Sequence, residues 1–250
     1  MKLVRYHKSG TTGYGILDSG VITVVRGLTD HTRTGEEFEA SAARLLAPCV
    51  PTKIVCGGLN YRDHAAEMNL PVPDEPVIFI KPPTAVLDPG GEIIYPPSSK
   101  QVEYEGELAA VIGRETKGIT PAEAKAHILG YTCMNDVTAR DLQRRDGQWT
   151  RAKSFDTFAP FGPWIETEFD PHDAKIETIL NGIVKQSSNT SNLIFPVDVL
   201  VAFISQVMTL HPGDVVASGT PPGIGPMHPG DEIEVRIAGI GSLVNRVRRV

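Results

Sequence analysis

Short apolar runs separated by Gly and Ser occupy the first fifty residues. Three of these runs have strand length and β-branched content: Met1–Tyr6, Tyr14–Asp18 and Val21–Val25. Residues 35–46 instead predict a helix, because one helical stripe carries Phe38, Ala42, Leu45 and Leu46. The segment APCVPTK then interrupts the pattern. We therefore predict a small β-rich cap over residues 1–50 and a second domain over residues 51–250.

The apolar runs that follow are also short, and Gly or Pro bounds most of them. Strands are predicted at residues 53–61, 76–82, 91–96, 105–113, 214–219 and 231–237. Residues 175–188 predict a hairpin that turns at Asn181-Gly182, the dipeptide most typical of a two-residue turn. The strands are thus closely spaced along the chain.

Two longer segments predict helices. Residues 120–130 combine a capping box from Thr120 to Glu123 with Gly130 as a terminator. Residues 196–210 carry an apolar face made of Val197, Leu200, Val201, Ile204, Val207 and Met208. Strands outnumber helices, and no β-α-β alternation occurs. These patterns predict a mainly β α+β fold with short peripheral helices.

Composition and charge exclude several classes of protein. The net charge is −6 and the Lys and Arg residues are scattered, so we expect no nucleic-acid partner. The N-terminus lacks the apolar core of a signal peptide, and no apolar run is long enough to span a bilayer, so we expect a cytoplasmic protein. The three Cys residues form no C-x-x-C pair, which argues against a zinc or redox site.

The stretch VEYEGELAAVIG places Glu103, Glu105 and Glu107 at alternate positions before an apolar run. If the strand is continuous, these carboxylates share one face, where neighbours repel by about 2 kcal/mol at an effective dielectric of about 20. Three interpretations are open: a solvated edge, pairing with Lys or Arg, or a bound cation. Asp136, in a second mostly apolar stretch, favours the cation. Carboxylates without a His or Cys cluster favour Mg²⁺ or Mn²⁺ over Zn²⁺, with Ca²⁺ as an alternative occupant in a crystal.

Further residues have catalytic side chains, although each also has a purely structural interpretation. His64 and Glu67 are three apart, so one helical turn would place them together as an acid–base pair or as a solvated surface pair. Lys153 is either a ligand for a substrate oxygen or a surface residue. The loop ASGTPPGIG allows backbone to approach a ligand and offers the hydroxyl of Thr220, or it is only a turn.

Six motifs in order together resemble the fumarylacetoacetate hydrolase family: GLNYRDHAAEM, PVIFIKPP, YEGELAAVIG, NDVTARDLQ, AKSF and SGTPPGIG. They extend from Gly58 to Gly225, and the first fifty residues resemble the variable cap of many members only loosely. The resemblance implies a mixed β-sheet roll and a homodimer or larger homo-oligomer. The second Gly of VCGGLNY departs from the family, in which an apolar or charged residue is commoner.

The resemblance also implies roles for individual residues. Glu105, Glu107 and Asp136 match the metal ligands, whereas Glu103 lies outside that set and is expected behind it or at the surface. His64 and Glu67 match a water-activating pair on a segment, residues 63–76, that closes over the site as a lid. Lys153 matches a residue that contacts substrate oxygens. Substrate-facing positions match Arg140, Gln143 and Thr220.

The chemistry implied is cation-assisted stabilisation of an enolate from a 2-oxo acid. The leading expectation is hydrolysis of a C–C bond in an acylpyruvate or fumarylpyruvate-like substrate, because His64 and Glu67 are retained. The alternatives are enzymes of aromatic catabolism, 2-hydroxyhepta-2,4-diene-1,7-dioate isomerase or 5-carboxymethyl-2-oxo-hex-3-ene-1,7-dioate decarboxylase, and an oxaloacetate decarboxylase or tautomerase. A metal-binding protein without catalysis is the most distant alternative.

Overall fold

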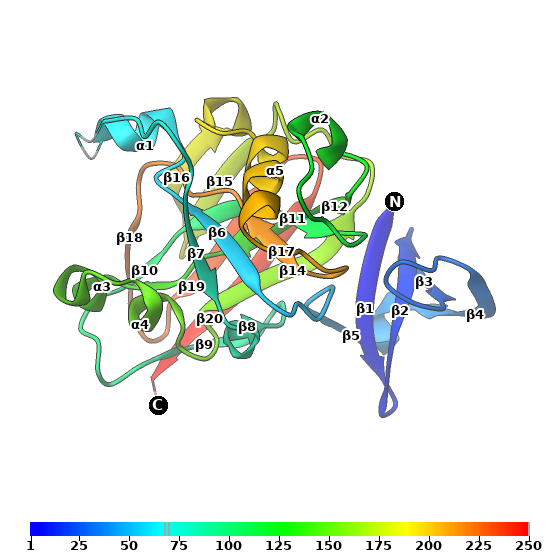
Figure 1. The fold of residues 1–250 in the computed structure, drawn as a ribbon. Coiled ribbons are helices and arrows are strands. Elements are labelled where there is room, and N and C mark those ends of the chain that lie inside the picture. The colour runs from blue at the N-terminus through cyan, green and yellow to red at the C-terminus, as the bar shows by residue number, and fades with distance from the viewer. Residues whose placement is uncertain (68, 70, 250) are drawn as a thin grey trace.

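Strands are the predominant secondary structure, and the helices are short and peripheral (Figure 1). The computed structural model describes residues 1–67, 69 and 71–249. The predicted mainly β α+β class, with mixed sheets, is confirmed. Among the described residues, no helix combines the length and the apolar character that a membrane crossing requires.

The largest sheet has twelve strands. Ten of them lie in the order β4 (Arg33–Glu39), β3 (Val21–Val25), β2 (Thr11–Asp18), β1 (Lys2–Lys8), β14 (Ala159–Glu166), β12 (Ile128–Asn135), β11 (Gly106–Ile112), β17 (Val215–Ala217), β6 (Ile54–Gly58) and β7 (Val77–Lys81). The other two pair outside this path: β5 (Arg44–Leu46) pairs with β1, and β8 (Val86–Leu87) pairs with β14. The strands β17 and β6 run parallel, so the sheet is mixed.

Two smaller sheets complete the strand structure. One has the order β13 (Thr138–Ala139), β10 (Val102–Tyr104) and β18 (Gly225–Met227). The other has the order β16 (Ile183–Asn189), β15 (Lys175–Leu180), β19 (Glu232–Ile237), β20 (Gly241–Arg249) and β9 (Glu92–Tyr95).

The helices lie outside the sheets. They are α1 (Arg62–Glu67), α2 (Pro121–Ala124), α3 (Arg140–Asp146), α4 (Thr150–Lys153) and α5 (Val197–Val207). Three single 3₁₀ turns cover Ala40–Ala42, Pro83–Ala85 and Thr190–Asn192. In Figure 1, α3 and α4 lie near one another, and α1 lies above them at the same side of the molecule.

The central strand β11 is buried along its whole length because it separates two apolar cores. Leu108, Ala110 and Ile112 point into a core shared with α5 and the five-stranded sheet. Ala109 and Val111 point into a second core on the opposite face. This two-sided burial explains why the stretch LAAVI is continuously apolar rather than alternating.

The predicted helix over residues 35–46 is wrong. The structure has β4, a 3₁₀ turn and β5 there. Phe38 stacks edge-on against Tyr6 with ring centroids 4.9 Å apart, and β4 pairs with β3. Of the predicted stripe, Leu46 is buried, Phe38 and Leu45 are partly buried, and Ala42 is exposed. Tertiary pairing therefore overrides a weak local propensity.

The predicted helix over residues 120–130 is also mostly wrong. Its first turn forms as α2, and the backbone N–H of Thr120 donates to Glu123 at 2.8 Å as the capping box requires. The chain then enters β12 at Ile128, which pairs with Ile112 of β11. Gly130 therefore does not end a helix but lies within β12. A glycine is needed there because a Cβ would lie 2.5 Å from the carbonyl oxygen of Glu166 on the neighbouring strand.

The hairpin and the second helix are confirmed. β15 and β16 pair from Leu180–Ile183 outward, and Asn181 and Gly182 both have the positive φ that this turn needs. Helix α5 buries Val197, Leu200, Val201 and Ile204 as predicted. Val207, at its last turn, is instead 57% exposed.

The first fifty residues form β1 to β5, which lie together at one side of the molecule (Figure 1). They continue the largest sheet, because Leu3 of β1 pairs with Ile165 of β14. The division of the chain at residue 50 stays a prediction.

Candidate active site

The stretch VEYEGELAAVIG, residues 102–113, passes from one sheet to another. β10 belongs to the three-stranded sheet and β11 to the twelve-stranded sheet, and Glu105 is the single residue between them. The chain crosses back between β12 and β13, at Asp136 and Val137. The expectation that Glu103, Glu105 and Glu107 share one strand face is therefore wrong, because the strand is interrupted at Glu105.

The two crossings lie side by side and bring three carboxylates together. The backbone N–H of Asp136 donates to the carbonyl of Glu105 at 2.8 Å, and that of Glu105 donates to Asn135 Oδ1 at 3.0 Å. One carboxylate oxygen from each of Glu105, Glu107 and Asp136 lies within 4.8 Å of the other two. All three side chains are buried. The residues predicted as metal ligands thus form one cluster.

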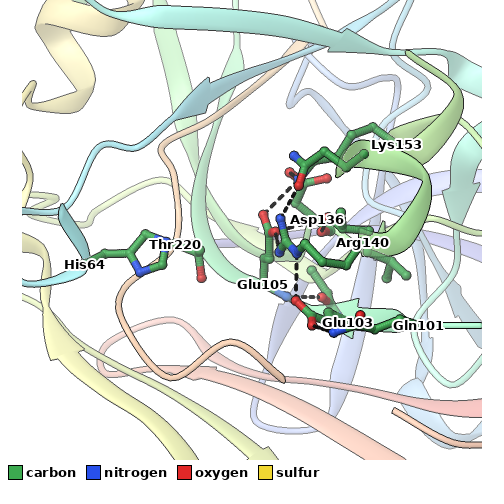
Figure 2. Close-up of polar contacts among 12 residues, drawn as sticks. His64, Gln101, Glu103, Glu105, Asp136, Arg140, Lys153 and Thr220 are labelled. Atoms are coloured by element: carbon green, nitrogen blue, oxygen red, sulfur yellow. Dashed lines mark hydrogen bonds and ion pairs between the residues drawn. The ribbon is translucent and has the colours of Figure 1, made fainter. Parts of the chain in front are cut away.

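Two buried lysines face this cluster. Lys153, the last residue of α4, donates to Glu105 Oε2 at 2.8 Å and to Asp136 Oδ2 at 2.6 Å (Figure 2). Lys81, the last residue of β7, donates to Asp136 Oδ1 and to the carbonyl oxygen of Val137 at 3.0 Å. Sequence reasoning predicts Lys153 but misses Lys81, although a lysine that ends an apolar strand in PVIFIKPP is a signal for a buried cation.

Arg140 connects the cluster to Glu103. Its Nε donates to Glu103 Oε2 at 2.7 Å, and its terminal nitrogens donate to Glu105 and to Gln143 (Figure 2). Gln101 also donates to Glu103, at 2.6 Å. Glu103 is therefore a buried acid behind the ligand set and not a surface residue. Of the three interpretations that the sequence leaves open, pairing with Lys or Arg is observed for Glu103 and Glu105.

The two glutamates of the triad have opposite electrostatic environments. Burial disfavours the charge on Glu105, but Lys153 and Arg140 outweigh it and hold the pKa of Glu105 below its ordinary range. Burial raises the pKa of Glu107 well above that of a normal carboxyl group, and repulsion from Asp136 and Glu105 raises it further. Within the described chain, the Glu107 carboxylate accepts one hydrogen bond, from Gly219 N–H at 2.9 Å.

The cluster fits a hard divalent cation. Its donors are carboxylate oxygens, the ligands that Mg²⁺, Mn²⁺ and Ca²⁺ prefer. The repulsion that raises the pKa of Glu107 is the kind that a cation removes. Three carboxylates leave about half of an octahedral shell for water or substrate.

His64 and Glu67 form the predicted pair on α1. The Nδ1 atom of His64 lies 3.0 Å from Glu67 Oε2, and the backbone N–H of Gly223 donates to Glu67 Oε1 at 3.2 Å. His64 is buried, whereas the Glu67 side chain is 44% exposed. This arrangement leaves the second ring nitrogen of His64 available for a ligand.

Polar contacts fasten the start of α1 to the segment before α5. Arg62 donates to the carbonyl oxygen of Leu193 at 2.6 Å, and Ser188 Oγ donates to Asp63 Oδ2 at 2.5 Å. Of the predicted lid, residues 63–76, Met68 and Leu70 lie outside the described residues. Closure of this segment stays a prediction.

A cavity of about 320 Å³ lies over the acids. It is lined by Gly57, Gly58, Leu59, His64, Phe79, Glu105, Glu107, Arg140, Gln143, Arg144, Trp149, Lys153 and Thr220. Every predicted site residue except Glu67 and Asp136 thus lines it, and those two touch residues that do. The Thr220 hydroxyl donates to the carbonyl of Gly106 at 2.9 Å and accepts from Gln186 at 2.8 Å, so its proton is already engaged.

An aromatic wall bounds this cavity and was not predicted. Trp149 packs edge-on against Phe79 with ring centroids 5.2 Å apart, and the Lys153 ammonium lies 4.9 Å from the Phe79 ring centroid. A Cβ on Gly58 would lie 2.8 Å from the Trp149 indole. The departure from the family at Gly58 is therefore explained, because this glycine leaves room for Trp149.

Comparison with known proteins identifies relatives with this architecture. Residues 53–248 match the family described as fumarylacetoacetate (FAA) hydrolase C-terminal, and residues 1–48 match one described as Rv2993c-like, N-terminal. Mitochondrial oxaloacetate tautomerase FAHD2B from Homo sapiens is 45% identical over 220 residues, which cover 83% of this chain and 70% of that protein.

Two solved structures are similar over the whole chain. 2-Hydroxyhepta-2,4-diene-1,7-dioate isomerase from Mycobacterium marinum has a TM-score of 0.93 at 42% identity, covering 100% of this chain and 98% of that one. 5-Carboxymethyl-2-hydroxymuconate delta-isomerase from Mycobacterium smegmatis has a TM-score of 0.93 at 44% identity, covering 100% and 99%. The match over residues 53–248, together with these identities, shows that the chain belongs to the fumarylacetoacetate hydrolase family.

Proposed function

We propose that this protein is a divalent-metal-dependent enzyme that interconverts the keto and enol forms of a 2-oxo acid. The observation that carries the proposal is the meeting of Glu105, Glu107, Lys153 and His64 at one cavity. The named relatives support it, because one is called an oxaloacetate tautomerase and two are called isomerases. These three names denote isomerisation, whereas a further similar structure, from Exiguobacterium antarcticum and 36% identical, is named a fumarylacetoacetate hydrolase.

Glu105, Glu107 and Asp136 would hold Mg²⁺ or Mn²⁺. When bound there, the cation supplies electrophilic stabilisation of the negative charge that develops on the keto oxygen of the substrate. Lys153 lines the same cavity and adds a positive charge for that oxygen. Burial opposes this charge, but Asp136 and Glu105 outweigh it and raise the pKa of Lys153, so the side chain stays an ammonium.

His64 is the candidate base. Glu67 accepts a hydrogen bond from the Nδ1–H group of His64. The other ring nitrogen, Nε2, is then free to take a proton from carbon. The C–H bond next to the keto group breaks and its proton passes to His64 Nε2. Its electron pair forms the C=C bond, and the keto oxygen takes up the displaced pair and then a proton from water, while His64 returns its proton to water. The reverse sequence returns the keto form, so His64 acts as base in one direction and as acid in the other.

Hydrolysis of an acylpyruvate C–C bond is the second candidate. The same contact between His64 and Glu67 favours it, because a histidine oriented by a carboxylate also activates water. Water would add to the acyl carbon, the C–C bond would break, and the released electron pair would form the enolate of pyruvate.

Two assays in parallel separate the candidates. Ultraviolet absorbance follows ketonisation of enol-oxaloacetate, and release of acetate and pyruvate follows cleavage of acetylpyruvate. We expect the protein to accelerate ketonisation with Mg²⁺ or Mn²⁺ and to lose this activity after chelation. Cleavage of acetylpyruvate without any acceleration of ketonisation would replace the first candidate by the second.

We also propose that the protein forms a homodimer or a larger homo-oligomer. β7 lies at the edge of the twelve-stranded sheet, and Val77 and Ile80 on it are 45% and 44% exposed. They border a recess of about 670 Å³ that Phe79 and Trp149 also line. A second copy seated on β7 would bury these side chains and cover the outer side of the aromatic wall.

A further inference from the structure

Arg144 lies one helical turn beyond Arg140 on α3 and lines the same cavity. The two arginines differ in what they already bind. Arg140 is 12% exposed and paired with Glu103 and Glu105. Within the described chain, Arg144 takes part in no ion pair, and its one hydrogen bond, to Gln101 Oε1, is 3.4 Å long. Its guanidinium is therefore available to an anion in the cavity.

The other lysine and arginine side chains that line the cavity are engaged. Lys153 is held by Glu105 and Asp136, and Arg140 by Glu103 and Glu105. In the described part of the chain, Arg144 is thus the lining cation without a carboxylate partner. An anionic group that reaches the cavity away from the acids meets this side chain.

The charge of the site favours a substrate with two negative charges. Four buried carboxylates, on Glu103, Glu105, Glu107 and Asp136, face two buried lysines, Lys81 and Lys153, and the partly buried Arg140. When all seven side chains are ionised, their net charge is −1, and a bound divalent cation changes this net charge to +1. The guanidinium of Arg144 raises the net charge to +2. The two carboxylates of a 2-oxo dicarboxylate cancel this net charge, whereas a 2-oxo monocarboxylate leaves a net charge of +1.

We propose that Arg144 binds the distal carboxylate of a 2-oxo dicarboxylate whose 2-oxo acid end lies at Glu105, Glu107 and Asp136. This proposal rests on the proposed function and names the class of substrate that the site selects. A second carboxylate beside the rings of Phe79 and Trp149 loses water and needs a compensating charge. A guanidinium supplies it through two parallel hydrogen bonds.

Arg145 provides a matched control. It follows Arg144 on the same helix and carries the same charge, but its Nε lies 3.6 Å from Asp146 Oδ1. Both arginines are exposed, but Arg145 does not line the cavity. Loss of Arg145 therefore removes the same long-range charge without removing a group from the cavity.

The test compares two ligands that differ only in the distal group, oxaloacetate with a carboxylate and 2-oxobutanoate with a methyl. Their dissociation constants are measured by competition at saturating Mn²⁺ for the wild type, Arg144→Met and Arg145→Met. We expect Arg144→Met to weaken oxaloacetate binding by about 10- to 100-fold, the range typical of a lost charge-assisted hydrogen bond. Binding of 2-oxobutanoate should change less than about twofold, and Arg144→Lys should recover part of the loss.

The proposal is overturned if both ligands weaken equally in Arg144→Met, or if Arg145→Met has the same effect on oxaloacetate. A Mn²⁺ titration of each variant verifies that the acid cluster is intact. Because the ratio of the two dissociation constants does not depend on the rate of ketonisation, the selectivity of Arg144 is tested separately from the proposed reaction. A wild type that binds oxaloacetate through Arg144 but does not accelerate its ketonisation would contradict the proposed function alone.

Discussion

The ammonium of Lys153 lies 2.6 Å from the carboxylate of Asp136, and both side chains are almost completely buried. Lys81 contacts the other oxygen of the same carboxylate. Asp136 therefore compensates two buried cations at once. Glu107, in contrast, forms no ion pair within the described residues and is repelled by two carboxylates.

This contrast predicts different effects for two variants that both remove a metal ligand. Asp136→Asn should abolish Mn²⁺ binding and lower the free energy of unfolding of the metal-free protein by about 3–5 kcal/mol, because buried Lys81 loses its carboxylate partner and Lys153 keeps only Glu105. Glu107→Gln should abolish Mn²⁺ binding without this loss. Calorimetric titration and denaturant unfolding measure the two quantities. Equal destabilisation by both variants would contradict the assignment of charges.

Metal affinity should increase with pH. The raised pKa of Glu107 means that its carboxyl keeps a proton at pH values at which a free glutamate has lost it. A cation that binds there must displace this proton, so binding is weaker and releases a proton below the raised pKa, and both effects disappear above it. Titration with Mn²⁺ in two buffers of different ionisation enthalpy measures the proton release. Affinity that does not change from acidic to neutral pH would exclude Glu107 as a ligand.

Removal of the base should reduce turnover more than binding. His64→Ala should lower kcat for oxaloacetate ketonisation by about 10²–10⁴-fold, the usual contribution of a general base. Glu67→Gln should have a smaller effect, because the amide still accepts from His64 Nδ1 but no longer stabilises the imidazolium. Stopped-flow absorbance gives both values, and added imidazole should partly restore the His64→Ala variant. If acetylpyruvate cleavage falls by this factor while ketonisation does not, His64 activates water instead.

The aromatic wall should respond to a single methyl group at Gly58. Gly58→Ala places a Cβ 2.8 Å from Trp149 and should displace the indole, whereas Gly57→Ala makes only ordinary contacts at 3.6 Å. We expect Gly58→Ala to raise KM and to change the Trp149 fluorescence, with Gly57→Ala close to the wild type. Trp164→Phe removes the one other tryptophan so that the signal is assigned. A Gly58→Ala variant with wild-type KM and fluorescence would show that the wall adjusts freely.

Self-association through β7 should depend on its exposed apolar side chains. Ile80→Lys introduces a charge at the proposed contact and should shift the protein toward the monomer, because a lysine on an edge strand opposes pairing with another strand. Sedimentation velocity measures the oligomeric state. Ile183→Lys, at the exposed first residue of β16 in the five-stranded sheet, is the control. A monomeric wild type, or an unchanged oligomer in Ile80→Lys, would exclude this surface.

The sequence predicts those parts of the site whose chemistry is local. Glu105 and Glu107 stand two residues apart, and His64 and Glu67 lie one helical turn apart, so short-range geometry brings each pair together, whereas Asp136 joins the acids only through the neighbouring crossing between sheets. Lys81 could not be found in the same way, because its partner lies 55 residues away and is reached only through the order of strands in the sheet. Trp149 is likewise defined by its contact with Phe79 and the space at Gly58.

The same limit applies to the fold. The hairpin at Asn181-Gly182 is specified by its own turn residues and forms as predicted. The capping box at Thr120 also forms, but it specifies only where a helix begins. The extent of that helix depends on pairing of Ile128 with Ile112, a contact that no local pattern contains.

The acids at the two crossings between sheets have a further consequence, for cooperativity. Glu105 and Asp136 stand where the chain passes between the three-stranded and the twelve-stranded sheet, and Glu107 belongs to the larger sheet. An ion bound to all three carboxylates therefore joins the two sheets, which we expect to open separately in the metal-free protein. Metal loading should slow amide exchange in β10, β13 and β18 together, so that in the loaded protein the smaller sheet opens only when the larger one does.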